Sequence, residues 1–239
     1  MFFVRYLCVI CAQFLILFLR ILSPMNTQLF EQVDFVENPT YEQVITDLLA
    51  CNYAIVDDFF SSEEIDELRQ SLKEVYEADR FKKAAIGNKF NEEIDKTIRG
   101  DFIKWINEAE GRPQERLFFA KINDLVAYLN RTCFLGILQK EFHYAIYPKG
   151  TFYKRHLDTF QNDDRRKLSM VCYLNDDSWV ASNGGELTIY LPEGDGERAL
   201  DIIPKPGRVV IFESQILEHE VKPVLASERL SITGWLKTR

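Results

Sequence analysis

Histidine is scarce in this 239-residue chain, which holds only three: His143, His156 and His219. Any site that needs two imidazoles must therefore use two of these three residues. Cysteine is also rare, because the five that occur are too few and too scattered for a disulfide scaffold or a thiolate zinc cluster. Excess positive charge is missing as well: the formal charge is −8, which argues against broad nucleic-acid binding.

What is present is typical of an ordinary globular protein, since 46% of the residues are hydrophobic and 28% are charged. Residues 6–19 (YLCVICAQFLILFL) differ from the rest because they carry no charge. As a helix they would span about 21 Å, short of a hydrocarbon core of roughly 30 Å. They are a signal or membrane anchor, a short interfacial helix, or an upstream extension of a chain that starts at Met25. We favour the last, and hence a cytoplasmic protein, with membrane association through residues 6–19 as the alternative.

The sequence after residue 24 predicts a single domain over residues 25–239, built from two kinds of pattern. Residues 25–132 are mostly helical in pattern. Ser61 and Glu64 form a capping-box signature before an apolar helical face. Helices are expected at 40–50, 61–75 and 114–130, and a short strand at 53–56. Residues 79–104 have no clean period and predict a long loop, a candidate lid over a site.

Residues 140–239 consist of short β-type runs separated by turn residues such as Pro204-Lys-Pro-Gly207. The predicted strands are 142–147, 152–158, 167–174, 186–191, 200–203, 207–212, 218–224 and 229–236. Strands at this spacing predict a sandwich or barrel. The expected fold class is therefore mainly β with flanking helices (α+β), with a double-stranded β-helix (jelly roll) core and the N-terminal helices packed on one sheet.

His156, Asp158 and His219 form the strongest candidate site. His156 and Asp158 lie two apart on a predicted strand, so their side chains would share a face. His219 starts a later strand that a jelly roll can bring alongside. Two histidines and one carboxylate match the facial triad of non-haem Fe(II), which leaves coordination positions open. A structural His–Asp hydrogen bond or a zinc site is the alternative.

Arg229 lies ten residues after His219, at the start of the next predicted strand. A guanidinium can bind a carboxylate through two parallel hydrogen bonds. An open metal beside such a group suits 2-oxoglutarate, whose far carboxylate would meet Arg229. The alternative for Arg229 is a surface ion pair at a strand end.

These residues resemble the catalytic core of the Fe(II)/2-oxoglutarate-dependent dioxygenases. The longer pattern resembles the prolyl 4-hydroxylases in order and spacing, and Ile98-Arg-Gly-Asp101 resembles the oxygen-sensing prolyl hydroxylases and their bacterial counterparts. The similarity covers about residues 95–238. Its other motifs are Tyr147-Pro-Lys-Gly150, Tyr153-x-Arg-His156-x-Asp158, Cys172-Tyr-Leu-Asn175, Gly184-Gly-Glu-Leu187, His219-Glu-Val221 and Trp235.

The resemblance implies a role for each matching position. His156, Asp158 and His219 would bind iron, and Arg229 would bind 2-oxoglutarate. Other implied roles are a hydroxyl of Tyr173 on the same carboxylate, Tyr147 lining the pocket, Leu187 and Trp235 as walls, and Arg99 and Asp101 in a mobile loop that closes over a peptide. The turn after Tyr147 and residues 159–167 depart from the family pattern and put the peptide specificity in doubt.

The remaining polar residues have plainer interpretations. We expect His143 to be structural, Cys172 to be a small buried apolar residue, and residues 165–167 to form a solvated loop that could meet an acidic substrate.

The predicted activity is hydroxylation of a prolyl residue in a protein or peptide, with release of succinate and CO2. The resemblance implies Fe(II), 2-oxoglutarate and O2, with L-ascorbate restoring oxidised iron. The carboxylate of Asp158 disfavours halogenation, because halogenating relatives lack it. A hydroxylase of a free amino acid or small metabolite, and a non-catalytic cupin-like metal-binding module, are the alternatives. No nucleic-acid partner is expected.

Overall fold

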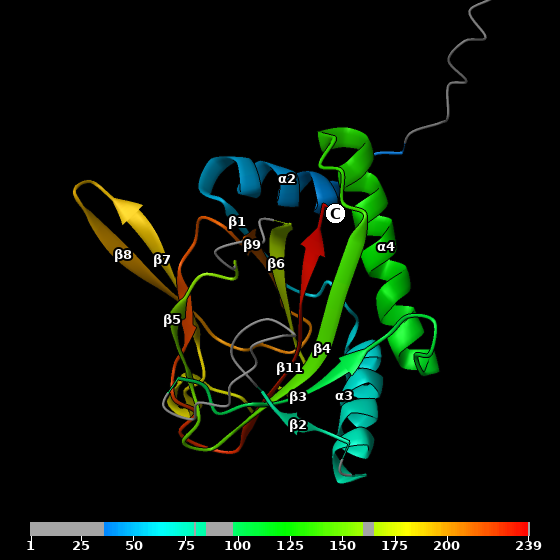
Figure 1. The fold of residues 1–239 in the computed structure, drawn as a ribbon, viewed down its shortest axis with the longest axis vertical. Coiled ribbons are helices and arrows are strands. Elements are labelled where there is room, and N and C mark those ends of the chain that lie inside the picture. The colour runs from blue at the N-terminus through cyan, green and yellow to red at the C-terminus, as the bar shows by residue number, and fades with distance from the viewer. Residues whose placement is uncertain (1–35, 79, 85–97, 160–164, 239) are drawn as a thin grey trace, which may run out of the picture. The chain divides into compact units, whose positions relative to one another are not determined.

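The computed structural model describes residues 36–78, 80–84, 98–159 and 165–238 (Figure 1). Residues 38–239 form one compact unit. The elements, in chain order, are α2 (Pro39–Cys51), β1 (Tyr53–Val56), α3 (Ser62–Glu77), β2 (Lys82–Lys83), β3 (Phe102–Ile106), α4 (Pro113–Cys133), β4 (Gln139–Pro148), β5 (Tyr153–His156), β6 (Arg166–Tyr173), the short 3-10 helix η1 (Ala181–Asn183), β7 (Leu187–Glu193), β8 (Gly196–Ile202), β9 (Val209–Glu213), β10 (His219–Val221) and β11 (Glu228–Lys237).

The helices begin where the sequence supplies partners for their free N–H groups. At α3, the Ser61 hydroxyl accepts from the Glu64 amide, and the Glu64 carboxylate accepts from the Ser61 amide at 2.8 Å, which confirms the predicted capping box. Asn38 caps α2 in the same way through its side-chain oxygen. Pro113 opens α4 at a position where no N–H is needed.

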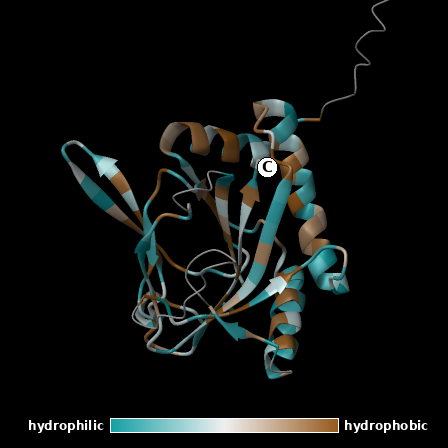
Figure 2. Cartoon of the chain, in the orientation of Figure 1, coloured by the Kyte–Doolittle hydropathy of each residue, from teal (hydrophilic) through white to brown (hydrophobic). Residues whose placement is uncertain are grey.

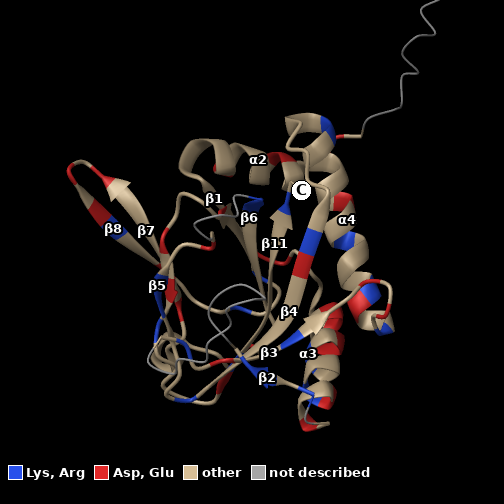
Figure 3. Cartoon of the chain, viewed as in Figure 1, with Lys and Arg blue, Asp and Glu red and all other residues tan. Residues whose placement is uncertain are grey.

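The strands form two antiparallel sheets. The large sheet has the order β1-β9-β6-β11-β4-β3-β2, and the small sheet has the order β5-β10-β7-β8. In Figure 1 the three helices cover the outer face of the large sheet, the small sheet lies on its other side, and the β7–β8 hairpin projects away from the body. Acidic side chains gather on α3 and on this hairpin (Figure 3).

Strand alternation divides the large sheet into two faces, as β4 shows. Phe142, Tyr144 and Ile146 belong to the apolar core shared with the helices. The residues between them point to the opposite face, toward the small sheet. Figure 2 shows hydrophobic residues on the strands and on the helix faces turned to them. The helices therefore support the large sheet from outside and leave its inner face for a site.

The predicted fold class is confirmed: the structure is mainly antiparallel β with helices on one sheet. All eight strands expected after residue 140 are found, with β4 and β8 longer and β5 and β10 shorter than expected. The loop expected at 79–104 is partly wrong, because β2 lies within it and β3 begins at its end, and both extend the large sheet. The central part of the candidate lid, residues 85–97, lies outside the described residues.

Residues 1–24, including the apolar stretch at 6–19, also lie outside the described residues. Among the helices that the structure describes, none is long and apolar enough to cross a membrane.

Candidate metal and cosubstrate site

The structure brings His156, Asp158 and His219 together. His156 ends β5 and pairs in register with His219, the first residue of β10. The Nε2 atoms of His156 and His219 each lie 3.5 Å from the Asp158 carboxylate, and one ligand atom from each residue lies within 4.8 Å of the others. One part of the prediction is wrong: Asp158 lies beyond the end of β5, so it reaches the site from a loop and not through strand alternation.

Both imidazoles are oriented by backbone carbonyls. The Nδ1 atom of His156 is 2.7 Å from the carbonyl of Lys154, and that of His219 is 3.2 Å from the carbonyl of Leu217. Since a carbonyl only accepts, Nδ1 carries the hydrogen in each ring, and Nε2 keeps its lone pair toward Asp158. This is the arrangement that metal-binding histidines adopt.

Asp158 is buried and held by a hydroxyl. Ser169 donates to the Asp158 carboxylate at 2.6 Å, and its oxygen lies 2.8 Å from the hydroxyl of Ser214. Burial alone would raise the pKa of Asp158, but His219, His156 and the Ser169 hydrogen bond together hold it well below its usual range. Burial lowers the pKa of His219 to about 4. At neutral pH Asp158 is therefore ionised and His219 is neutral.

This donor set fits Fe(II). Two imidazole nitrogens and one carboxylate oxygen converge on one point, and the carbonyl and hydroxyl groups that orient them are in place. The cluster contains no cysteine, which distinguishes it from common structural zinc sites.

Arg229 provides a second, unsatisfied half of the site. The side chain is 1% exposed, yet its Nε has no hydrogen-bond partner in the part of the chain that the structure describes. Among the described residues, its guanidinium makes one side-chain hydrogen bond, to Ser231 at 3.2 Å, and has no ion pair. The surface ion pair weighed from the sequence is therefore wrong, because Arg229 points inward.

Aromatic hydroxyls surround this guanidinium. Its central carbon lies 5.1 Å from the ring centre of Tyr147 and 5.0 Å from that of Tyr173. The buried Tyr173 hydroxyl also has no hydrogen-bond partner within the described residues, and burial raises the pKa of both phenols. A buried cation beside the unpaired Tyr173 hydroxyl is costly alone and fits a carboxylate ligand.

The two predicted wall residues lie on the facing sheets. Leu187 is buried at the start of β7 and packs in a cluster with Tyr173. Trp235 is buried on β11, beside the position of Ser169 on β6. Their placement is compatible with the walls that the resemblance implies.

Arg99 and Asp101 form a buried ion pair, with two hydrogen bonds of 2.8 and 2.6 Å. The Arg99 guanidinium lies 4.3 Å from the ring centre of Tyr153, which in turn stacks on His156 with centroids 3.7 Å apart. An isolated bridge joins Arg99 to Tyr153 in the backbone as well. The described part of the predicted substrate loop is thus fixed to β5.

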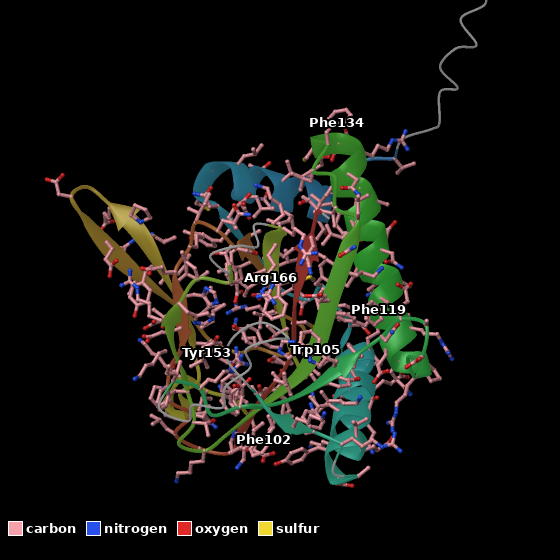
Figure 4. All side chains as sticks on the ribbon, in the orientation of Figure 1. Phe102, Trp105, Phe119, Phe134, Tyr153 and Arg166 are labelled. Atoms are coloured by element: carbon pink, nitrogen blue, oxygen red, sulfur yellow. The ribbon has the colours of Figure 1, made fainter. Side chains whose placement is uncertain are left out.

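Sequence reasoning missed several contributors. Ser169 was overlooked, although a serine within an apolar strand on the same face as Tyr173 is an identifiable signal. The expectation of a solvated loop at 165–167 is wrong for Arg166, which begins β6. Its guanidinium carbon lies 3.5 Å from the ring centre of Trp235, and the guanidinium donates to the Asp158 carbonyl at 3.1 Å. Figure 4 shows Arg166, Trp105 and Tyr153 in the region between the sheets. Cys172 is buried, as expected.

Comparison with known proteins agrees with this geometry. Residues 142–237 match the family described as the 2OG-Fe(II) oxygenase superfamily. The chain is 34% identical to a Pseudomonas putida prolyl-4-hydroxylase of known structure, covering 84% of this chain and all of that one, with a TM-score of 0.74. The chain therefore belongs to the 2OG-Fe(II) oxygenases and is a 2-oxoglutarate-dependent dioxygenase, for which the family implies Fe(II), 2-oxoglutarate and O2.

Within that superfamily, several of its relatives are named prolyl hydroxylases. It is 28% identical to a Trichoplax adhaerens prolyl hydroxylase solved with a hypoxia inducible factor peptide fragment, covering 83% of this chain and 89% of that one, with a TM-score of 0.72. It is 30% identical to the Caenorhabditis elegans hypoxia-inducible factor prolyl hydroxylase, over 81% of this chain but only 28% of that protein. The match with a Maricaulis maris PKHD-type hydroxylase likewise covers only 39% of that protein.

Proposed function

We propose that this protein hydroxylates a prolyl residue in a protein or peptide, with Fe(II) held by His156, Asp158 and His219. The observation that carries the proposal is the pairing of this converged triad with the buried, unpaired Arg229. A metal site alone fits many proteins, and a buried arginine alone fits several ligands. Together they fit a keto diacid bound to an open metal, and the prolyl hydroxylase relatives support the choice of substrate.

The residues of the chain perform separate tasks. The carbonyls of Lys154 and Leu217 fix the imidazoles so that their lone pairs face the metal position. Arg229 binds the distal carboxylate of 2-oxoglutarate, and the Tyr173 hydroxyl donates to the same group. When bound, Fe(II) with 2-oxoglutarate and O2 supplies the oxidising power for C–H hydroxylation. The protein itself orients these groups and excludes water.

In this proposal, the residues around the metal and Arg229 have supporting roles. Tyr147, Leu187 and Trp235 line the cosubstrate pocket. Arg99 and Asp101 hold the segment that leads into β3, next to the entrance where a peptide would lie. L-Ascorbate would restore iron oxidised in turnover without substrate. The predicted domain over residues 25–239 and the cytoplasmic location remain predictions.

Two measurements test this function. The first is release of labelled CO2 from 1-labelled 2-oxoglutarate with iron, in the parent and in His156→Ala and His219→Ala variants, both of which are expected to release none. The second is mass spectrometry of a prolyl-peptide library after incubation, expected to show a gain of one oxygen on proline. Unchanged turnover in His219→Ala would contradict the site assignment. Turnover with free amino acids alone would favour the small-metabolite hydroxylase, and metal binding without turnover the cupin-like module.

A further inference from the structure

The third histidine faces the inside of the site. His143 lies on β4 between Phe142 and Tyr144, whose side chains point to the helices, so its own side chain points the other way. Its side chain is 3% exposed, and its Nδ1 atom has no hydrogen-bond partner among the described residues. A structural histidine in a core normally has its ring nitrogens paired. This orphaned nitrogen is therefore unexpected for the purely structural role predicted from the sequence.

The strand register places His143 between the two halves of the site. Arg229 pairs with Tyr147 at one end of the β4–β11 ladder, and Trp235 lies opposite Ser169, the hydroxyl partner of Asp158, toward the other end. His143 pairs with Thr233, two residues from Trp235 along β11. Because alternate residues share a face, His143 lines the interval between Arg229 and Asp158, nearer the metal end.

Two tryptophans hold the imidazole in place. Its ring centre lies 4.9 Å from that of Trp105 on β3 and 5.6 Å from that of Trp235 on β11. These large rings restrict the imidazole without satisfying its nitrogen, since neither Nδ1 of His143 nor Nε1 of Trp235 has a hydrogen-bond partner among the described residues. The ring is thus fixed in orientation and still has hydrogen-bonding capacity.

The imidazole is neutral under ordinary conditions. Burial is the main cause that lowers the pKa of His143 to about 3, and the charges of Arg99, Asp101, Asp158 and Arg166 also act on it. A neutral imidazole has one N–H donor and one lone pair. It can therefore donate to an anion without adding a second buried charge to the site.

We propose that His143 is a binding residue for the cosubstrate, donating a hydrogen bond to the carboxylate of 2-oxoglutarate that is remote from Arg229. This inference rests on the proposed function and extends it to a residue outside the metal triad and the Arg229 anchor. A keto diacid held by Arg229 at one end presents its keto-acid group toward His156, Asp158 and His219. If the keto oxygen and one carboxylate oxygen of that group bind the metal, the second carboxylate oxygen is left without a partner. The unpaired nitrogen of His143 can donate a hydrogen bond to it.

The test is the affinity for 2-oxoglutarate of the full chain loaded with Mn(II), measured by calorimetry without O2. His143→Leu removes the donor and keeps an apolar side chain of similar bulk, whereas His143→Asn keeps an amide N–H near the Nδ1 position. We expect His143→Leu to raise the Kd for 2-oxoglutarate by about tenfold or more, and His143→Asn to stay within about threefold of the parent. The Kd for Mn(II) itself should not change in either variant.

The outcomes separate the inference from the function on which it rests. If the parent binds 2-oxoglutarate and His143→Leu binds it equally well, the inference is overturned and the proposed function stands. The inference is also overturned if His143→Leu weakens only the binding of a prolyl peptide, because His143 would then contact the substrate. If the Mn(II)-loaded parent binds no 2-oxoglutarate, the proposed function and the inference both fail.

Discussion

The two halves of the site differ in how far the protein satisfies its own polar groups. At the metal end, each imidazole has a carbonyl on Nδ1 and the carboxylate has a serine hydroxyl. At the anchor end, the Arg229 guanidinium and the Tyr173 hydroxyl are buried with unpaired atoms. Both ends lie between the same two sheets, so they differ in the hydrogen-bond partners that the protein supplies and not in their place in the fold.

This difference indicates how each half is organised. The metal end is pre-organised, because its geometry is fixed by bonds that need no ligand. The anchor end is costly to fold, because a buried guanidinium with no carboxylate partner among the described residues loses its hydration and gains only the Ser231 hydrogen bond in return. A ligand carboxylate would remove that cost, so binding at this end should stabilise the protein more than its contact area suggests.

The largest expected effect comes from breaking the metal end. Asp158→Ala removes the only charged donor of the triad, and the affinity for Fe(II) or Mn(II) should fall by more than about 100-fold, with loss of turnover. Asp201→Ala is the matched control, because Asp201 is a carboxylate on the small sheet that pairs with Lys222 and takes no part in the site. Equal metal affinity in the Asp158 variant and the control would show that the triad is not the metal site.

Replacing Arg229 at the anchor end should weaken the binding of 2-oxoglutarate without destabilising the ligand-free protein. Arg229→Met should raise the Kd for 2-oxoglutarate by about tenfold or more, since a charge-assisted contact is lost. The ligand-free variant should be at least as stable as the parent by urea denaturation, because an unpaired buried charge is replaced by an apolar chain of similar length. A clearly less stable ligand-free variant would contradict the claim that this half is unsatisfied.

Acid should destabilise the metal-free protein through His143, which lies between the two halves. Its pKa is about 3 in the folded state, against an unfolded value near 6.5. The unfolded chain therefore binds the extra proton as pH falls below about 6.5, and at pH 5 this one group should cost about 2 kcal/mol of stability. His143→Leu should lose less stability than the parent between pH 7 and pH 5. Identical pH profiles of the unfolding free energy would show that His143 is not buried and neutral.

The smallest effect should come from the support of the metal end. Ser169→Ala removes the hydroxyl that donates to Asp158, and the affinity for Mn(II) should fall by about tenfold while the fold is kept. Ser214→Ala is the control, because Ser214 contacts Ser169 and not the carboxylate. If both variants bind Mn(II) as the parent does, the metal end does not depend on this hydroxyl.

The sequence predicted the architecture well where periodicity and capping are local properties. The α3 cap at Ser61 and the alternation along β4 follow from neighbouring residues. It failed at β3, whose FIKWI sequence has no clean alternation and becomes a strand only through pairing with β4. Long-range pairing of this kind is a tertiary effect that local patterns do not contain.

The same limit applies to the site. The scarcity of histidine and the spacing of Arg229 were enough to nominate the residues that the structure brings together. The position of Asp158 beyond the end of β5, the Ser169 hydroxyl and the inward-facing Arg166 depend on how loops meet across the two sheets. Orphaned atoms such as Nδ1 of His143 are visible only in three dimensions.

The stack that runs from Asp101 through Arg99 and Tyr153 to His156 ties the entry into β3 to a metal-site imidazole. Adding or deleting a residue in the segment 98–101 would shift the guanidinium and tilt the phenol that lies flat on that imidazole. This short stretch is therefore poorly suited to changes of length, although it belongs to a connection between strands.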